Sequence, residues 1–325
     1  MCAELLLLRH GKSDWNTELD DFHRPLKDRG KRGAQRIGVW LAQQGLEPDY
    51  IISSAAERAL VTAQKCCKAM GLDPQNIYQD PRLYEADLDM LLAMLEDIPG
   101  QAKRVMLVGH NPSFESLLRW LADDFIPWPE DGKLLPTATL ARLKMHHNWD
   151  SLKPGSASLQ KIIRPRELPK KFPFPSPHGS ERRDRPAYYY TQSAVIPWRI
   201  RNGKAEILIV SSSKRKHWVI PKGIWEPGLT AQESAAREAM EEAGVEGHVA
   251  EMAVGSYSYP KWGATCTVEV YSMEVSRVLP EQEWEEVHRG REWVSPEQAE
   301  NRLKQDELKP MVRKLALLLQ NKSPL

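Results

Sequence analysis

The stretch GIWEPGLTAQESAAREAMEEAGV, residues 223–245, carries the most informative pattern in this chain. Thr230, with a glutamate three residues later, is typical of a helix N-cap, so a helix should begin there. In that helix Glu238, Glu241 and Glu242 are spaced i, i+3 and i+4 and share one face. Clustered carboxylates repel one another unless a cation lies between them, and their hard oxygens suit Mg²⁺ or Mn²⁺. The stretch therefore predicts a metal-binding helix, against the simpler alternative of a solvated acidic face.

The same stretch resembles the Nudix box, G-x5-E-x7-R-E-U-x-E-E-x-G-U, where U is aliphatic. The matching residues are Gly223, Arg237, Glu238, Glu241, Glu242, Gly244 and Val245. The resemblance implies an α+β Nudix fold that hydrolyses a phosphoanhydride with Mg²⁺ or Mn²⁺. It implies that Glu241 and Glu242 are metal ligands, and that Glu238 is a ligand or the group that orients the attacking water.

Leu229 stands where the box has its first glutamate, and a leucine cannot bind metal. Glu226, three residues earlier, or a water would have to serve instead. The departure also leaves a second hypothesis open. The chain would then be a sensor that binds a polyphosphorylated ligand through a weakened site and regulates a partner.

The flanking segments narrow the resemblance. LIVSSSKRKHWVIPKGIWEPG and the later HRGREWVSPEQA are similar to diphosphoinositol polyphosphate phosphohydrolases, which also act on diadenosine polyphosphates and polyphosphate. In that interpretation Lys214, Arg215, Lys216 and Lys222 contact a phosphate-dense substrate. The alternative for Lys214, Arg215 and Lys216 is a solvated hairpin turn. Trp218 or Tyr257 would stack on an adenosine, or pack in the core.

The first half of the chain alternates short apolar runs with segments of helical spacing. This order predicts βαβ units and a largely parallel sheet with flanking helices, an α/β fold. Ligands of such sheets lie at the carboxyl ends of the strands. His10 and His110 each follow a predicted strand, and Arg9 and Arg58 occupy comparable positions, so we expect them to meet at one edge.

Five segments of this half occur in an informative order. They are LLRHG at the N-terminus, RPLKDRG from Arg24, SSAAERALVTAQ from Ser53, LYEAD from Leu83 and VGHNPSFESLL from Val108. Together they resemble the histidine phosphatase superfamily, in its small SixA-type phosphohistidine phosphatase branch.

The resemblance implies that His10 accepts the phosphoryl group, while Arg9, Arg58 and His110 hold its oxygens. Arg24 would be a further substrate-binding residue, and Glu85 the nearest candidate for a general acid. Imidazole suits the nucleophile because much of it is neutral at neutral pH, and arginine suits oxyanions because its planar fork donates two parallel hydrogen bonds. No cofactor is implied for this half.

About 100 residues separate the two histidines, with no segment that predicts a lid over the site. An open site favours a bulky substrate, such as a phosphohistidine protein or the end of a polymer. Glu57, beside Arg58, adds a negative charge where relatives differ, and would shift substrate preference.

Residues 170–186 are rich in proline and basic side chains, and prolines fix φ and lack a donor N–H. We interpret them as a linker between a histidine phosphatase domain at 1–169 and a Nudix domain at 187–325. The alternative is a basic arm that docks a polyanion.

The composition excludes several classes of protein. With 45 Lys+Arg against 44 Asp+Glu, bulk charge does not favour nucleic acid as a partner. Leu5 to Leu8 is too short an apolar run for a membrane span. Cys2, Cys66, Cys67 and Cys266 show no metal spacing, so we expect free thiols in the cytoplasm. The expected partner is a small phosphorylated substrate, and the oligomeric state is not predicted.

Overall fold

The computed structural model describes residues 3–174 and 182–320. The chain forms two compact units that divide between Phe172 and Pro173, and each is described by itself. The N-terminal unit has a six-stranded sheet of order β3-β2-β4-β1-β5-β6. Its strands are β1 (Glu4–Arg9), β2 (Tyr50–Ser54), β3 (Ile77–Asp80), β4 (Arg104–Gly109), β5 (Leu140–Met145) and β6 (Ala157–Ile163). The first four strands in the sheet order pair in parallel and the last two antiparallel, so the predicted α/β fold is confirmed.

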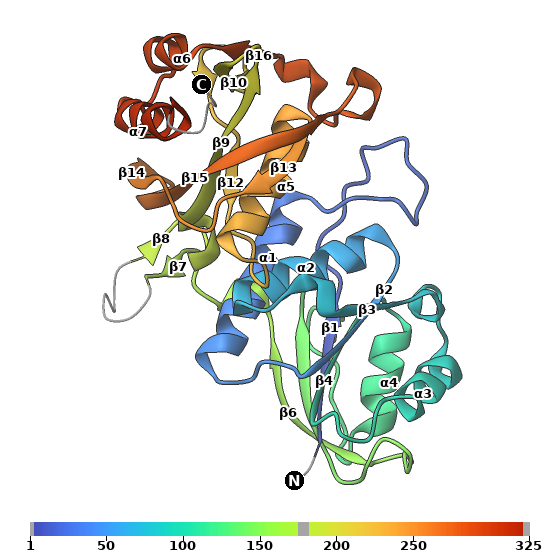
Figure 1. The fold of residues 1–325 in the computed structure, drawn as a ribbon. Coiled ribbons are helices and arrows are strands. Elements are labelled where there is room, and N and C mark those ends of the chain that lie inside the picture. The colour runs from blue at the N-terminus through green and yellow to red at the C-terminus, as the bar shows by residue number, and fades with distance from the viewer. Residues whose placement is uncertain (1–2, 175–181, 321–325) are drawn as a thin grey trace. The chain divides into compact units, whose positions relative to one another are not determined.

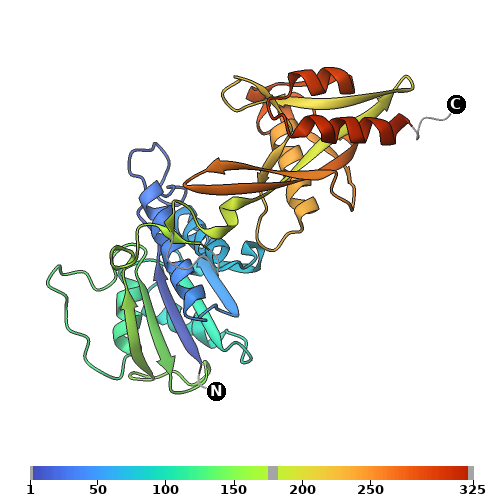
Figure 2. The same cartoon turned by 90° about the vertical axis from the view of Figure 1, so that its left-hand side faces the viewer.

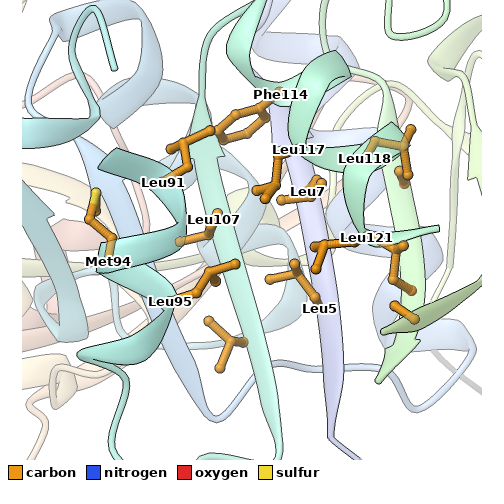
Figure 3. Close-up of a cluster of buried hydrophobic side chains, with 14 of the residues drawn as sticks. Leu5, Leu7, Leu91, Met94, Leu95, Leu107, Phe114, Leu117, Leu118 and Leu121 are labelled. Carbon is orange, nitrogen blue, oxygen red and sulfur yellow. The ribbon is translucent and has the colours of Figure 1, made fainter. Parts of the chain in front are cut away.

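Helices cover both faces of this sheet (Figure 1). They are α1 (Asp28–Gln43), α2 (Glu57–Met70), α3 (Leu88–Glu96) and α4 (Ser113–Leu121), with the short 3-10 helices η1 (Pro74–Asn76), η2 (Pro81–Leu83) and η3 (Pro165–Glu167). Successive strand side chains point to opposite faces, so Leu5 and Leu7 pack towards α3 and α4, and Leu6 and Leu8 towards α1 and α2. Figure 3 shows Phe114 and Leu117 of α4 lying over β1 and β4. This two-sided burial explains the unbroken apolar run in β1.

The C-terminal unit is an eight-stranded sheet with the central order β11-β10-β9-β15-β13. Its strands are β9 (Thr191–Arg201), β10 (Lys204–Ser211), β11 (Trp218–Val219), β12 (Lys222–Ile224), β13 (Val245–Val249), β14 (Gly255–Lys261), β15 (Ala264–Val278) and β16 (Arg291–Val294). Its helices are α5 (Ala231–Ala243), α6 (Pro296–Arg302) and α7 (Leu308–Gln320), with the 3-10 helices η4 (Ala187–Tyr190), η5 (Glu281–Glu283) and η6 (Val287–Arg289). In Figure 2, α7 lies along the sheet on the side opposite α5, and each helix has its own apolar cluster.

Local sequence signals determine where several strands and helices of this unit begin and end. Asn202 and Gly203 have φ of 53° and 71°, and they form the left-handed turn that joins β9 to β10. Thr230 accepts the backbone N–H of Glu233, whose carboxylate accepts the N–H of Thr230, so the predicted capping box is present. Gly244 ends α5 at φ 59°, a conformation that favours glycine.

The middle of the predicted linker, residues 175–181, lies outside the described residues. On either side, β7 (Phe172–Pro173) pairs with β8 (Arg182–Arg183) in a two-stranded sheet. Phe172 is buried, and the Arg183 guanidinium is buried over the ring of Tyr190. The ends of the segment are therefore packed rather than solvated, although its prolines keep each strand to two residues.

This packing predicts where limited proteolysis begins. Lys170, Lys171 and Arg182 are exposed, whereas Arg183 is buried. Trypsin is expected to cut first after one of the exposed residues and to yield two stable fragments. Mass spectrometry of the fragments identifies the cut. First cuts before Lys170 or after Arg182 would contradict the prediction.

The sequence predicted free cysteine thiols and no membrane-spanning segment. Cys66, Cys67 and Cys266 are buried free thiols, and Cys2 lies outside the described residues. No helix in the described ranges is both long and apolar enough to cross a bilayer.

Candidate active sites

Two histidines meet where β1 and β4 end. These strands are parallel neighbours, so the residues that follow them, His10 and His110, lie side by side with ring centroids 5.1 Å apart. Arg9 is the last residue of β1, and Arg58 stands in the first turn of α2 after β2. The sheet therefore brings together the four residues that the sequence predicted at this edge.

His10 is held as a neutral imidazole. Its Nδ1 lies 2.7 Å from the carbonyl oxygen of Gly11, which can only accept, so Nδ1 carries the proton and Nε2 keeps its lone pair. Gly11 N in turn donates to Thr62 Oγ1 at 2.9 Å, which fixes the turn. Burial, then the neighbouring His110, lowers the pKa of His10 to about 3. An unprotonated ring nitrogen is thus present at neutral pH.

His110 is buried beside it. Its Nε2 lies 2.9 Å from Ser54 Oγ at the end of β2, and its buried Nδ1 has no hydrogen-bond partner in the described part of the chain. Burial, followed by the positive charge of Arg58, lowers the pKa of His110 to about 4. A buried polar atom without a partner is costly, so this nitrogen is suited to a polar ligand group.

Asp21 contacts two of the cations of the site, and no sequence pattern predicted it. Its carboxylate accepts from Arg58 Nη2 at 2.7 Å and from Tyr84 Oη at 3.0 Å, and it also pairs with Arg24. Arg24 stacks on Trp15 at 3.5 Å. Two guanidinium groups and a phenol can therefore hold one set of anionic oxygens here, beside the histidine pair.

Arg9 and Glu85 border this cluster differently. Arg9 donates to the carbonyl of Leu135 at 2.7 Å, and its buried Nε has no partner among the residues described. Glu85 is exposed, has φ 58°, and lines a cavity of about 490 Å³ with Arg58 and His110. An acid at this rim could reach the leaving group of a substrate, although no contact in the structure fixes it there.

The lowered histidine pKa values predict a pH effect on stability. The unfolded histidines take up protons near pH 6.5, but the folded ones stay neutral until about pH 4. The unfolded state then binds more protons, so the free energy of unfolding should fall as pH drops below about 6.5. Urea midpoints at pH 7.5 and 5 measure this. The double variant His10→Asn/His110→Asn should lose less stability over that interval; an equal loss would refute the assignment.

The C-terminal unit has a cavity of about 550 Å³ where α5, β12 and the segment before β16 meet. Glu226, Glu238 and Glu242 supply its acids. Its cations are Lys214, Lys216, Lys222, Lys261, Arg289 and Lys304. A cavity lined by both carboxylates and cations suits an anion that carries a metal ion with it.

The acids of this cavity are crowded. Burial, and then repulsion from Glu242, Glu241 and Glu226, raises the pKa of Glu238 to about 8. Glu242 accepts from Lys222 N at 3.0 Å and pairs with Arg289, yet burial still raises its pKa. A Cβ on Gly223 would lie 1.8 Å from Glu238 Oε1, so only glycine leaves room for this carboxylate.

Glu226 lines the cavity, and Leu229 does not. The turn between them explains this: Leu229 N donates to the carbonyl of Glu226 at 3.1 Å, and Trp225 Nε1 donates to the carbonyl of Leu229 at 2.7 Å. The turn therefore places an acid beside Glu238 from a position three residues before the one in the motif.

Other predicted residues fall in different places. Glu241 pairs with Arg237 at 2.8 Å and lies outside the cavity lining, as does Arg215, which donates to the carbonyl of His288. Tyr257 is buried in the core and stacks on Tyr259, and it is Tyr259 that lines the cavity. Trp218 packs against the same core and under Arg302. Arg289 and Lys261 were not predicted, because they lie far from the box in sequence.

The donor set fits a divalent cation. Burial and the repulsion among these carboxylates raise the pKa of Glu238, and a positive ion between them would favour the ionised form of each. Within residues 3–174 and 182–320, no three His, Cys, Asp or Glu side chains are already arranged to hold a metal. Glu241 is paired with Arg237, and Glu242 with Arg289. Metal binding by these two carboxylates would require the ion pairs to open.

Comparison with known proteins assigns a family to each half. The NUDIX domain model matches residues 190–315, and the histidine phosphatase superfamily (branch 1) model matches residues 5–99. The chain is 32% identical over 142 residues to Nudix hydrolase 12, mitochondrial, of Arabidopsis thaliana, covering 36% of this chain and 69% of that protein. It is 29% identical over 156 residues to an uncharacterized protein of Mycobacterium tuberculosis, covering 47% of this chain and 96% of that protein. The predicted pairing of the two families is confirmed.

Solved structures similar to the chain also fall into two groups. The putative phosphohistidine phosphatase SixA from Nakamurella multipartitia is 26% identical and covers 51% of this chain and 97% of its own, with a TM-score of 0.43. A C. elegans Ap4A hydrolase binary complex is 22% identical and covers 41% of this chain and 98% of its own, with a TM-score of 0.36.

Proposed function

Because the chain belongs to the Nudix hydrolases through its C-terminal half and joins it to a histidine phosphatase half, we propose that it is a bifunctional phosphohydrolase. Residues 1–169 and 187–325 would be its two domains. The observation that supports the proposal is that each unit has its own cluster of residues suited to phosphate chemistry. One cluster is a neutral histidine pair among arginines, and the other is a cavity lined by three carboxylates and by lysines.

In the N-terminal reaction, Nε2 of His10 attacks phosphorus, and the bond from phosphorus to the leaving group breaks. Arg9, Arg58 and His110 hold the phosphoryl oxygens, and Arg24 extends the site. The leaving group takes a proton from Glu85 or from solvent. Water then hydrolyses the phosphohistidine and returns His10. The support is the Nδ1 contact to Gly11, which leaves Nε2 free to attack, together with the two arginines that already hold an oxyanion, Asp21.

In the C-terminal reaction, a phosphoanhydride is hydrolysed. Glu226, Glu238 and Glu242 would hold Mg²⁺ or Mn²⁺, with Glu241 once its contact to Arg237 opens; the ion would supply positive charge to the diphosphate and acidify a water. Lys214, Lys222 and Lys261 would bind the remaining phosphates. Glu238 would be a ligand of the ion or the group that orients the water and takes up its proton.

The cations around this cavity favour a substrate rich in phosphate. Six lysine or arginine side chains line it, more than one diphosphate requires. Inositol pyrophosphates, diadenosine polyphosphates and inorganic polyphosphate share this chemistry, and Tyr259 offers a ring for a base. The N-terminal centre would then remove a terminal phosphate from the product, or act separately on a phosphohistidine protein.

A panel of phosphate compounds tests the proposal. Phosphate release is measured from diphosphates and monoesters with Mg²⁺ and with EDTA, using the wild type and a variant inactivated in each half. We expect metal-dependent cleavage of diphosphates and metal-independent cleavage of monoesters or phosphohistidine. Tight binding of a polyphosphorylated ligand without any hydrolysis would favour the sensor hypothesis instead.

A further inference from the structure

A third cavity, of about 500 Å³, lies in the N-terminal unit away from the histidine pair. It is bounded by the first turns of α1, residues 131–139 and the 3-10 helix η3. It shares no lining residue with the cavity at Glu85 or with the cavity of the C-terminal unit. Neither proposed reaction uses it.

The lining of this cavity is strongly basic. Its cations are Lys12, Arg29, Arg36, Lys133, Arg164 and Arg166, and its only acid is Asp131. Asp131 pairs with Arg164 at 2.9 Å and with Arg166 at 3.5 Å. The other four cations therefore remain without a compensating carboxylate in the lining.

None of these four cations forms an ion pair with a residue that the structure describes. Arg36 donates to the carbonyl of Lys170 at 3.3 Å. The side chains of Lys12, Arg29 and Lys133 make no ion pair with any described residue. Like charges gathered in one concave site repel one another, and a bound anion relieves that repulsion.

The floor of the cavity is shaped by a glycine. Arg29, Gly33 and Arg36 recur on one face of α1, with the glycine between the two arginines. Glycine is unfavourable inside a helix, but here a Cβ would lie 3.1 Å from Ala138 Cβ and would narrow the floor. Thr139 also lines the cavity, and its buried Oγ1 has no hydrogen-bond partner in the described part of the chain. The space left by the missing side chain of Gly33 and the hydroxyl of Thr139 without a described partner both indicate a ligand.

We infer that this cavity binds a small, phosphate-dense anion, such as a short polyphosphate chain, at a site separate from both reaction centres. Its volume is in the range of small-molecule sites, and its arginines and lysines are the side chains that bind phosphate oxygens. A nucleic-acid strand would instead need cations along an extended track with stacking rings. The inference does not depend on the proposed function.

The bound anion would lie against the backbone that carries His10. Lys12 is two residues beyond His10, and Ala138 N donates to the carbonyls of Arg9 and His10 at 3.1 and 3.0 Å. Lys12 and Ala138 both line the cavity. The site is thus placed next to the histidine pair, whatever compound that centre acts on.

Lysine reactivity gives a local test with inorganic tripolyphosphate as the probe. The full-length His10→Ala chain is acetylated at low ionic strength with EDTA present, so that neither proposed centre consumes the probe. We expect tripolyphosphate to slow acetylation of Lys133 at least fivefold. Lys103 and Lys144, which are exposed on the same unit, should react at an unchanged rate. Mass spectrometry quantifies each site.

Arg29→Ala removes one cation from the cavity, and Lys144→Ala is its matched control outside it. Arg29→Ala should raise the tripolyphosphate concentration that half-protects Lys133 about tenfold, and Lys144→Ala should not change it. Circular dichroism checks that both variants are folded. If Lys133 reacts equally with and without the probe, or if Arg29→Ala leaves its protection unchanged, the inference is wrong. Neither result would bear on hydrolysis at the two centres.

Discussion

Replacing His10 with alanine is expected to abolish phosphate release by the metal-independent centre, by about 10³-fold or more. The carbonyl oxygen of Gly11 accepts a hydrogen bond from Nδ1 of His10, so Nε2 of His10 keeps its lone pair for attack on phosphorus. His110, its neighbour, uses Nε2 in a contact with Ser54. Trapping the acid-labile phosphoenzyme with a ³²P-labelled substrate measures the loss directly.

The control for this variant is His147→Ala, an exposed histidine on the same unit, which should leave phosphoenzyme formation unchanged. Metal-dependent cleavage of diphosphates by the other half should also stay the same in His10→Ala. A phosphoenzyme that still forms without His10 would move the nucleophile elsewhere, and His110 would be the next residue to replace.

Much of the fold could be predicted because local chemistry determines it. The apolar run of β1 requires cover on both faces of the sheet, and the helices that follow supply it. Asn202–Gly203 and the Thr230–Glu233 capping box determine a turn and a helix start from neighbouring residues alone. The antiparallel pairing of β5 and β6 has no such local signal, because it depends on how a long connection returns across the sheet.

The candidate sites were predicted less completely, for a related reason. Strand order places His10 beside His110, so a rule about parallel sheets finds them. Asp21 reaches Arg58 across 37 positions through an irregular loop, and no periodicity reports such a contact. Arg289 reaches Glu242 across 47 positions in the same way. Motif spacing also misplaces the acid at Leu229, because the turn at Glu226 determines which side chain faces the cavity.

In the C-terminal half, Glu242→Gln is expected to lower metal-dependent diphosphate hydrolysis by about 10²-fold or more, the scale of losing one electrostatic contributor. The amide keeps the shape of the side chain and can still accept the N–H of Lys222. It removes a negative charge that a divalent cation needs, and it frees Arg289. Initial rates with Mg²⁺ measure the loss, and Mn²⁺ titration by calorimetry should show weaker binding. Glu274→Gln, an exposed carboxylate on β15, is the control and should change neither quantity.

Leu229→Glu and Glu226→Gln then distinguish a rearranged metal site from a weakened one. Glu226 already lines the cavity, and its charge is one of those that raise the pKa of Glu238. Leu229→Glu should therefore change the rate by less than about threefold, whereas Glu226→Gln should lower it about tenfold or more. If Leu229→Glu instead raises hydrolysis strongly, the natural site lacks a ligand that Glu226 does not replace. If the wild-type chain binds polyphosphorylated ligands, hydrolyses none of them and is indifferent to Glu242→Gln, the C-terminal half is a sensor.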